Sequence, residues 1–467
     1  MLRAAVPYVL AAASIAMGTL AIAGTQARSH ARRISWADTA PLHVRLETAG
    51  ITASTFASYA ERAHQDNARR IRQGDFDHLI FYALQSAHFT PLPPLEPALS
   101  AKALVEALEP GKRDAFLKTG DTSAARVPDP VRSRVAALLR AVESSDPDPR
   151  LAYFRELVNG AFPVRRVREA AVLHEYLRVM RFVYEKEFVA QRSARGADAV
   201  IELYRTRGLS TDTAVESGYL VYLGLGIIKS LTPERRIRRV LVIGPGLDIA
   251  PRTALLEVGP PESYQPWAII DALLALELSR AADLEVVAAD INPRVVAHLR
   301  RARAEPPTLI LVSELAETGG VRLSEDFGEY FARLGSAVGD VGISAPSDGG
   351  HRRKDVRVHS SVARVLRAEP LDIVTERLDE APFDVIIATN IFPYFDDVAL
   401  MLAMSNIAGM LAPGGIFLHN EPRPAMLDVT AALGLALEQS RQAVIAAARP
   451  APLVDVVFLH RKAGRPQ

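Results

Sequence analysis

The distribution of apolar and polar positions divides this chain into two halves with different periodicities. From about Thr52 to Leu231, apolar residues recur at spacings of three and four, which is typical of amphipathic helices. After Leu231, short apolar runs alternate with helical stretches, which is typical of an open and mostly parallel sheet with helices on its faces. We therefore expect an all-α domain over residues 28–231 and an α/β domain over residues 232–467.

The second half predicts a definite succession of elements. Its strands are expected at Arg239–Ile243, Glu285–Ala289, Arg364–Ala368, Val385–Ala388, Ile416–Asn420 and, as a final hairpin-like strand, Val454–His460. Its helices are expected at Ala214–Ile228, behind an N-cap in Ser210–Asp212, and at Trp267–Ser279, Pro293–Ala304 and Ser324–Leu334. Between them, residues 305–360 read as a long and mostly irregular insert, with a polar, Gly-rich and mobile stretch at Gly339–Arg353.

The first 27 residues predict a hydrophobic anchor or signal segment. Ala4–Ala23 is about 20 residues without a charge, which is long enough to span a bilayer. Small residues around Ala23 and Ala27 also offer cleavage sites, so an exported protein is the alternative. More positive charge follows the segment than precedes it, which favours an uncleaved anchor with the body of the protein in the cytoplasm.

Composition narrows the classes of partner. The chain has 467 residues, with 55 Lys and Arg against 54 Asp and Glu, so its net charge of +1 provides no field that would recruit nucleic acid. There is no cysteine, hence no disulfide and no thiolate metal site. His64, His78 and His88 show no paired ligand spacing, so no metal site is expected and these histidines read as ordinary, partly buried residues.

The most informative local pattern is a buried strand that runs into Gly244-Pro245-Gly246. Such a glycine turn lets the backbone approach a bound nucleotide closely. A dinucleotide fingerprint would need a third glycine where Ile249 stands, and a carboxylate about 20 residues on. Asp290 lies about 46 residues beyond Gly244, so both mismatches count against a nicotinamide or flavin dehydrogenase. Asp290 ends the second strand, where it could accept hydrogen bonds from ribose hydroxyls or cap a helix.

Further polar residues follow the other strands. Asp372 is placed to bind an adenine edge, with a turn carboxylate as the equal alternative, and Asn390 ends the fourth strand ahead of Tyr394. His419 and Glu421 are candidates to accept a proton, although a structural role is favoured for each. The segment before the first strand is a candidate cover for the cleft, with Arg205 and Arg207 reaching into it, while Tyr219 and Tyr222 share one helix face and read as core.

Taken together, the glycine loop, the acidic strand end, the FDVIIATN strand and the LAPGGIF turn resemble class I S-adenosylmethionine-dependent methyltransferases. The layout over about Arg239–Glu421 is more specifically similar to the chemotaxis-receptor glutamate methyltransferases. That resemblance rests on the following positions: Asp290-Ile291, Tyr330-Phe331, Asp372-Ile373, and Asn390 with Tyr394, Phe395 and Asp396. Two positions depart from that family, because Thr389 replaces an arginine and Asp372 replaces an asparagine.

The resemblance implies a Rossmann-like fold and S-adenosylmethionine as cofactor. It implies that the cofactor is bound by Gly244, Gly246, Asp290, Ile291, Asp372, Ile373 and Asn390. Asn390 and Tyr394 become the candidates for orienting a methyl acceptor, an O or N atom of a small molecule or a protein side chain. The alternative is a non-catalytic, membrane-associated scaffold that binds a partner through its helical domain.

Overall fold

The computed structural model describes residues 31–193, 196–250, 259–342, 349–421, 423–447 and 451–464. The apolar segment Ala4–Ala23 lies outside these residues, so the membrane anchor and the cytoplasmic location stay predictions. In the described ranges, no helix is both long enough and apolar enough to cross a bilayer.

A large, mostly parallel sheet organises the second half of the chain, as the sequence predicts. Its strand order is β5-β12-β13-β11-β10-β2-β3-β8. The strands are β2 (Arg239–Ile243), β3 (Glu285–Asp290), β5 (Arg322–Leu323), β8 (Leu366–Pro370), β10 (Phe383–Ala388), β11 (Leu411–His419), β12 (Leu435–Ala447) and β13 (Leu453–Lys462). The five strands from β8 to β11 pair in parallel, and β13 lies antiparallel between β11 and β12.

The strand order creates a crevice at one point of the sheet. From β2 the chain moves outward through β3 to β8, and it then returns to the other side of β2 to form β10. At such a switch point, the loops that follow two neighbouring strands run in opposite directions and leave a crevice between them. Ligands of doubly wound sheets bind in this crevice, beyond the carboxyl ends of the strands. The fold therefore directs attention to the loops after β2 and β10.

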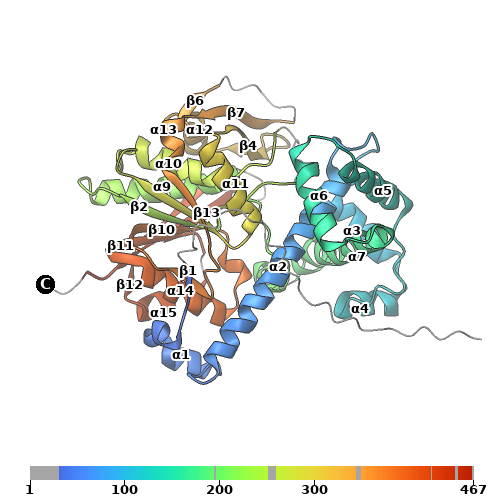
Figure 1. The fold of residues 1–467 in the computed structure, drawn as a ribbon, viewed down its shortest axis with the longest axis horizontal. Coiled ribbons are helices and arrows are strands. Elements are labelled where there is room, and N and C mark those ends of the chain that lie inside the picture. Colours follow the sequence, from blue (N-terminus) through green and yellow to red (C-terminus); the bar gives the residue numbers. More distant parts are fainter. Residues whose placement is uncertain are drawn as a thin grey trace, which may run out of the picture.

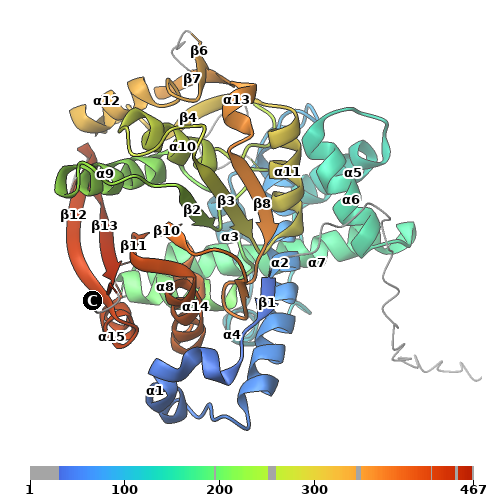
Figure 2. The same cartoon turned by 60° about the vertical axis from the view of Figure 1, so that its left-hand side comes forward.

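Both faces of the central strands are buried, which explains their continuous apolar runs. Along β2, Val240 and Val242 face one core, while Leu241 and Ile243 face the other. The first face is covered by α9 (Val215–Leu231), α10 (Gln265–Ala275), α11 (Pro293–Ala304), α12 (Glu325–Arg333) and α13 (Ser360–Ala363). The second face is covered by α1 (His43–Thr48), α14 (Asp397–Met410), α15 (Pro424–Ala432) and the 3-10 helix η1 (Trp36–Leu42). Figure 2 shows these two helical layers on either side of the sheet.

A third core belongs to a helical unit beside the carboxyl edge of the sheet. It is built from α2 (Phe56–Gln85), α3 (Pro97–Glu106), α4 (Pro110–Thr119), α5 (Asp129–Glu143), α6 (Pro149–Ala161) and α7 (Arg165–Tyr184). A π-helical turn, η2 (Glu185–Ala190), and α8 (Gly196–Thr206) follow α7. Figure 1 shows α2 running diagonally from α1, below the sheet, into this unit. Accordingly, Phe56 and Ala60 pack in the sheet's core, whereas Phe76 to Leu84 pack in the helical core.

Several expectations about the elements are wrong in detail. The insert over residues 305–360 is not mostly irregular, because β4 (Thr308–Ala316), β6 (Gly339–Val341) and β7 (His351–Val358) form a second, antiparallel sheet. The predicted mobile stretch falls partly on residues 343–348, which lie outside the described residues. The N-cap of α9 is Ala214 rather than Ser210–Asp212, and the exposed strand β12 was not predicted.

The N-terminal end of the described chain also joins the sheet. The short strand β1 (Ala31–Arg33) pairs with β9 (Glu376–Leu378), and Leu42 and Leu46 are fully buried against the sheet. The helix α9 likewise shares the sheet's first core. The division into residues 28–231 and 232–467 stays a prediction.

One buried carboxylate ties the helical unit to the sheet. Asp75 of α2 accepts hydrogen bonds from the Tyr153 hydroxyl at 2.7 Å, from the side-chain amide of Asn292 at 3.1 Å and from the Arg294 guanidinium at 2.6 Å. Its side chain is only 1% exposed. Because Asn292 and Arg294 start the helix after β3, this cluster fixes α2 beside the carboxyl end of that strand.

We expect Asp75→Ala to lower the free energy of unfolding by at least ~2 kcal/mol, since it leaves buried donors without an acceptor. Urea denaturation followed by circular dichroism measures the change. Glu61→Ala, at an exposed position of the same helix, is the matched control and should stay within about 0.5 kcal/mol of wild type. Equal stabilities of the two variants would contradict this role for Asp75.

Candidate functional site

The turn after β2 is shaped by two glycines in the left-handed region. Gly244 has φ +66° and Gly246 has φ +75°, which side chains rarely adopt. A Cβ on Gly246 would also lie 2.3 Å from the Thr211 carbonyl oxygen and 2.3 Å from the Thr213 hydroxyl. The turn therefore needs glycine both for its backbone angles and for the close approach of residues 211–213.

A cavity of about 820 Å³ lies at the switch point of the sheet. It is lined by all seven of the predicted cofactor-binding residues: Gly244, Gly246, Asp290, Ile291, Asp372, Ile373 and Asn390. Tyr394, the other candidate for orienting an acceptor, lines it too. Residues from four strand ends thus meet in one hollow, while their individual roles stay predictions.

Asp290 is a buried carboxylate at the tip of β3. Its Oδ1 accepts a hydrogen bond from the backbone amide of Asn292 at 2.7 Å, and its Oδ2 accepts one from the backbone amide of Gly246 at 3.4 Å. Burial raises the pKa of Asp290 to about 6, against the lowering effect of these two amides. The cap of the following helix α11 is Asn292, whose side chain accepts from the Arg294 amide. Asp290 itself is therefore not the N-cap, and it borders both the glycine turn and the cavity.

Asp372 is fully engaged with protein donors. Its carboxylate accepts hydrogen bonds from Asn67 at 3.1 and 3.2 Å, from the Thr375 hydroxyl at 2.8 Å and from the Val374 amide at 3.1 Å. His64 lies 3.3 Å away. These contacts match the turn-carboxylate alternative and add a tie to α2, while the adenine contact of Asp372 stays a prediction.

Asn390 and Tyr394 occupy the tip of β10. Asn390 has φ +60°, and it is held there by Asn420, which accepts from the Asn390 amide at 3.0 Å and donates to its side-chain oxygen at 2.8 Å. The Tyr394 carbonyl accepts from Arg70 at 3.1 Å, and its ring packs edge-on against Tyr204 at 5.6 Å. Asn420 thus holds the Asn390 side chain, and the Tyr394 ring packs on Tyr204.

Other sequence candidates lie away from the cavity. Among the described residues, His419 and Glu421 do not line it, and neither do Tyr330 and Phe331. His419 is 1% exposed and stacks on Phe417, Phe458 and His460, and burial lowers its pKa well below the usual value. It is therefore a neutral core residue. Tyr330 and Phe331 lie in the sheet's first core, where Tyr219 and Tyr222 also pack against Tyr330.

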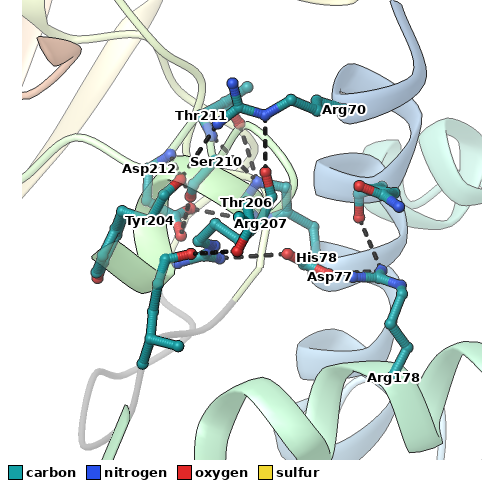
Figure 3. Close-up of polar contacts among 12 residues, drawn as sticks. Arg70, Asp77, His78, Arg178, Tyr204, Thr206, Arg207, Ser210, Thr211 and Asp212 are labelled. Atoms are coloured by element: carbon teal, nitrogen blue, oxygen red, sulfur yellow. Dashed lines mark hydrogen bonds and ion pairs between the residues drawn. The ribbon is translucent and has the colours of Figure 1, made fainter. Parts of the chain in front are cut away.

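The segment before α9 does border the cavity, but only one of its two arginines reaches it. Arg207 lines the cavity, whereas Arg205 does not and is paired with Glu202 at 2.9 Å. Figure 3 shows Asp77 of α2 between Arg178 and Arg207. The loop after α8 is thereby fixed to α2.

Sequence reasoning missed the part that α2 plays. Arg70 donates to the carbonyls of Tyr204 and Arg207, and the ring of His78 accepts from the Thr211 backbone amide at 3.2 Å (Figure 3). Arg70 also donates to the Tyr394 carbonyl. The Thr211 hydroxyl donates a hydrogen bond to the Leu247 carbonyl at 2.7 Å, and the Thr211 carbonyl accepts one from the Leu247 amide at 2.8 Å. The loop over residues 207–213 is consequently held between α2 and the glycine turn. Asn67, Arg70, Asp77 and His78 recur at spacings typical of one helix face and are buried in the structure, and this recurrence is the signal that could have identified them.

Comparison with known proteins gives remote similarities in structure alone. No family model matches the chain, and no curated protein matches its sequence. Among solved structures, a TehB-like SAM-dependent methyltransferase from Corynebacterium glutamicum shares 12% identity over 52% of this chain and 86% of its own, with a TM-score of 0.26. N-methyltransferase NodS from Bradyrhizobium japonicum, in complex with S-adenosylhomocysteine, shares 13% identity over 52% and 87%, with a TM-score of 0.27.

A third similar structure is the magnesium protoporphyrin IX methyltransferase ChlM from Synechocystis with bound SAM. It shares 8% identity over 54% of this chain and 82% of its own, with a TM-score of 0.28. Scores this low do not carry an activity over to this chain. The more specific resemblance to chemotaxis-receptor glutamate methyltransferases finds no support among these proteins, and the Tyr330-Phe331 pair on which it partly rested is buried away from the cavity.

The packing on Gly246 generates a test. Gly246→Ala should lower the free energy of unfolding by more than ~2 kcal/mol, because it combines an unfavourable backbone angle with a clash against backbone and hydroxyl oxygens. Gly414→Ala is the matched control, since Gly414 has φ +73° but nothing lies within 4 Å of the place that a Cβ would take. Its free energy of unfolding should fall by only about 1 kcal/mol, the cost of placing an alanine at a positive φ without a clash. Equal losses in urea denaturation would contradict the close approach of the loop.

Proposed function

We propose that this protein is a methyltransferase that uses S-adenosylmethionine and moves its methyl group directly to an O or N acceptor. The observation that carries the proposal is the meeting of Gly244, Asp290 and Asn390 in one cavity at the switch point of a doubly wound sheet. The sheet, with its antiparallel β13 between β11 and β12, fits a methyltransferase fold.

The residues present fit an adenosyl cofactor. Gly244, Gly246 and Asp290 line the same cavity, and Asp290 offers a buried carboxylate beside the glycine turn. We assign ribose binding to Asp290 and contacts with the adenosyl group to Ile291 and Ile373, which line the same cavity. Asp372 supports this wall by joining the turn after β8 to α2 rather than by presenting its own carboxylate.

When bound, the cofactor supplies a methyl group on a sulfonium, already activated for attack by a nucleophile. The chain's own residues then have to position the acceptor and exclude water. At the tip of β10 the Asn390 side chain is held by Asn420 and the Tyr394 ring packs on Tyr204, and we propose that these two residues orient the acceptor. The loop over residues 207–213 covers the glycine turn and limits access of water from that side.

Binding of S-adenosylhomocysteine to the full chain, measured by isothermal titration calorimetry, tests the cofactor. We expect micromolar affinity, and we expect Asp290→Ala to weaken it by roughly 10- to 100-fold, equivalent to the ~1–3 kcal/mol of a lost hydrogen bond to a charged group. Asp384→Ala is a control carboxylate at the opposite end of the sheet, where it accepts from the amides of Arg238 and Arg239. Absence of binding of both S-adenosylmethionine and S-adenosylhomocysteine would contradict the proposal.

Methyl incorporation then separates an enzyme from a scaffold. Radiolabelled S-adenosylmethionine is incubated with the full chain and a fractionated lysate, and label in an acceptor is measured. Incorporation that depends on Asn390 supports the enzyme. Cofactor binding without incorporation in any fraction would instead favour the non-catalytic alternative.

The pKa of Asp290 predicts how binding depends on pH. The carboxylate accepts ribose hydroxyls best when it is ionised, and its raised pKa of about 6 means that it becomes protonated below that pH. We therefore expect the affinity for S-adenosylhomocysteine to be level above pH 7 and to fall below pH 6 by up to about tenfold per pH unit, until it levels off roughly 10- to 100-fold lower, where Asp290 is fully protonated. Asp290→Asn, which cannot titrate, should give a weaker and level profile. An identical fall in both proteins would show that another group is responsible.

A further inference from the structure

The cavity extends beyond the strand tips to the helical unit, whose share of the lining is mainly apolar. There the helical unit contributes large side chains that are only half-buried, so part of each faces the hollow: Ile71, Phe81, Phe182, Ile201, Tyr204 and Leu209. Phe81 and Phe182 rest on the core of the helical unit and expose their other side to the cavity. Apolar surface of this extent, gathered in one hollow, is typical of a binding site for the apolar body of a ligand.

An aromatic wall connects this end with the tip of β10. The ring of Phe182 packs edge-on against Tyr204, with the ring centres 6.0 Å apart, and Tyr204 packs edge-on against Tyr394 at 5.6 Å. Tyr394 neighbours Asn390, the residue proposed to orient the acceptor. A ligand body lying along Phe182 and Tyr204 would therefore bring its end to the strand tips where the cofactor is proposed to bind.

The charged side chains at this end are already paired. Lys186 and Glu187 form an ion pair at 3.1 Å, and Arg207 is 3.3 Å from Asp77 while its guanidinium lies over the ring of Phe182. Glu96 caps α3 by accepting from the Ala98 amide. The Arg207–Asp77 pair is buried, so a charged ligand that broke it would face a high energetic cost, and one that left it intact would lose hydration against the apolar side chains. The lining therefore favours a neutral ligand.

We infer that the methyl acceptor is a neutral small molecule with an aromatic or aliphatic body, bound in this apolar end of the cavity, hereafter the helical pocket. This inference rests on the proposed function, since it assigns the acceptor side of the same site. Of the two kinds of acceptor left open by the sequence, a small molecule or a protein side chain, it chooses the small molecule, whose apolar body would contact Phe81, Phe182 and Ile201.

Two fluorescent probes with the same ring body test the helical pocket. N-phenyl-1-naphthylamine is neutral, and 8-anilino-1-naphthalenesulfonate carries a sulfonate; both brighten in apolar surroundings. We titrate each into the full chain, with and without saturating S-adenosylhomocysteine. The neutral probe should bind at least roughly tenfold more tightly than the anionic one, and S-adenosylhomocysteine should leave its affinity within about threefold. Equal affinities, or displacement of the neutral probe by S-adenosylhomocysteine, would overturn the inference.

Variants locate the probe. Ala98→Phe fills the helical pocket without removing a core side chain, and Ile201→Asn places an amide in its wall. Each should weaken binding of the neutral probe roughly tenfold while leaving affinity for S-adenosylhomocysteine unchanged. Val167→Asn, at a 45% exposed position of α7, is the matched control and should change neither. Unchanged probe binding in both Ala98→Phe and Ile201→Asn would overturn the inference, and thermal melting confirms that each variant is folded.

The two proposals fail in different ways. If the proposed function is wrong, S-adenosylhomocysteine does not bind, whereas the neutral probe still binds and still responds to Ala98→Phe. If the acceptor class is wrong, S-adenosylhomocysteine binds normally and the neutral probe shows no preference for the helical pocket. Methyl transfer to a neutral aromatic alcohol or amine, reduced by Ala98→Phe, is the positive result that supports both.

Discussion

The site depends on where one helix crosses the carboxyl edge of the sheet. The first turn of α2 packs in the sheet's core through Phe56, and its last turn packs in the helical core through Leu84, so the helix cannot shift along its axis without disturbing both. Its polar side chains form hydrogen bonds where it crosses the sheet edge. Asn67 bonds to Asp372 in the turn after β8, and Asp75 bonds to Asn292 at the start of α11. Buried hydrogen bonds of this kind are costly to leave unmade, so they define one position for the helix rather than adding much net stability.

The same helix gives the cavity its two chemical characters. On the sheet side it meets strand tips with a carboxylate, amides and a glycine turn, which suit a polar adenosyl group. On the helical side it contributes Ile71 and Phe81 to an apolar lining. The loop over residues 207–213 lies between α2 and the glycine turn, because Leu209 donates to the Arg70 carbonyl and Thr211 bonds to Leu247. A shift of α2 would therefore alter the proposed cofactor site and the helical pocket together.

The sequence predicted the sheet-derived part of the site for a simple reason. Each signal is local, a buried strand followed at once by Gly244, Asp290 or Asn390, and parallel strands bring their carboxyl ends to one edge. Contacts such as that between Asn67 and Asp372, 305 residues apart, have no local signal. The role of His419 was harder to judge, since a strand buried on both faces shows no alternation that reveals which side a polar residue faces. The sheet of β4, β6 and β7 was missed because a polar, Gly-rich stretch separates two of its strands.

The central claim is that strand tips and α2 together enclose an adenosyl group. A crystal structure of the full chain grown with S-adenosylhomocysteine tests this most directly. The account predicts density for the ribose against Asp290, with the adenine beside Ile291 and Ile373 and the homocysteine sulfur toward the Asn390 side of the cavity. Density for the ligand elsewhere, or a cavity occupied only by solvent at saturating ligand, would contradict it.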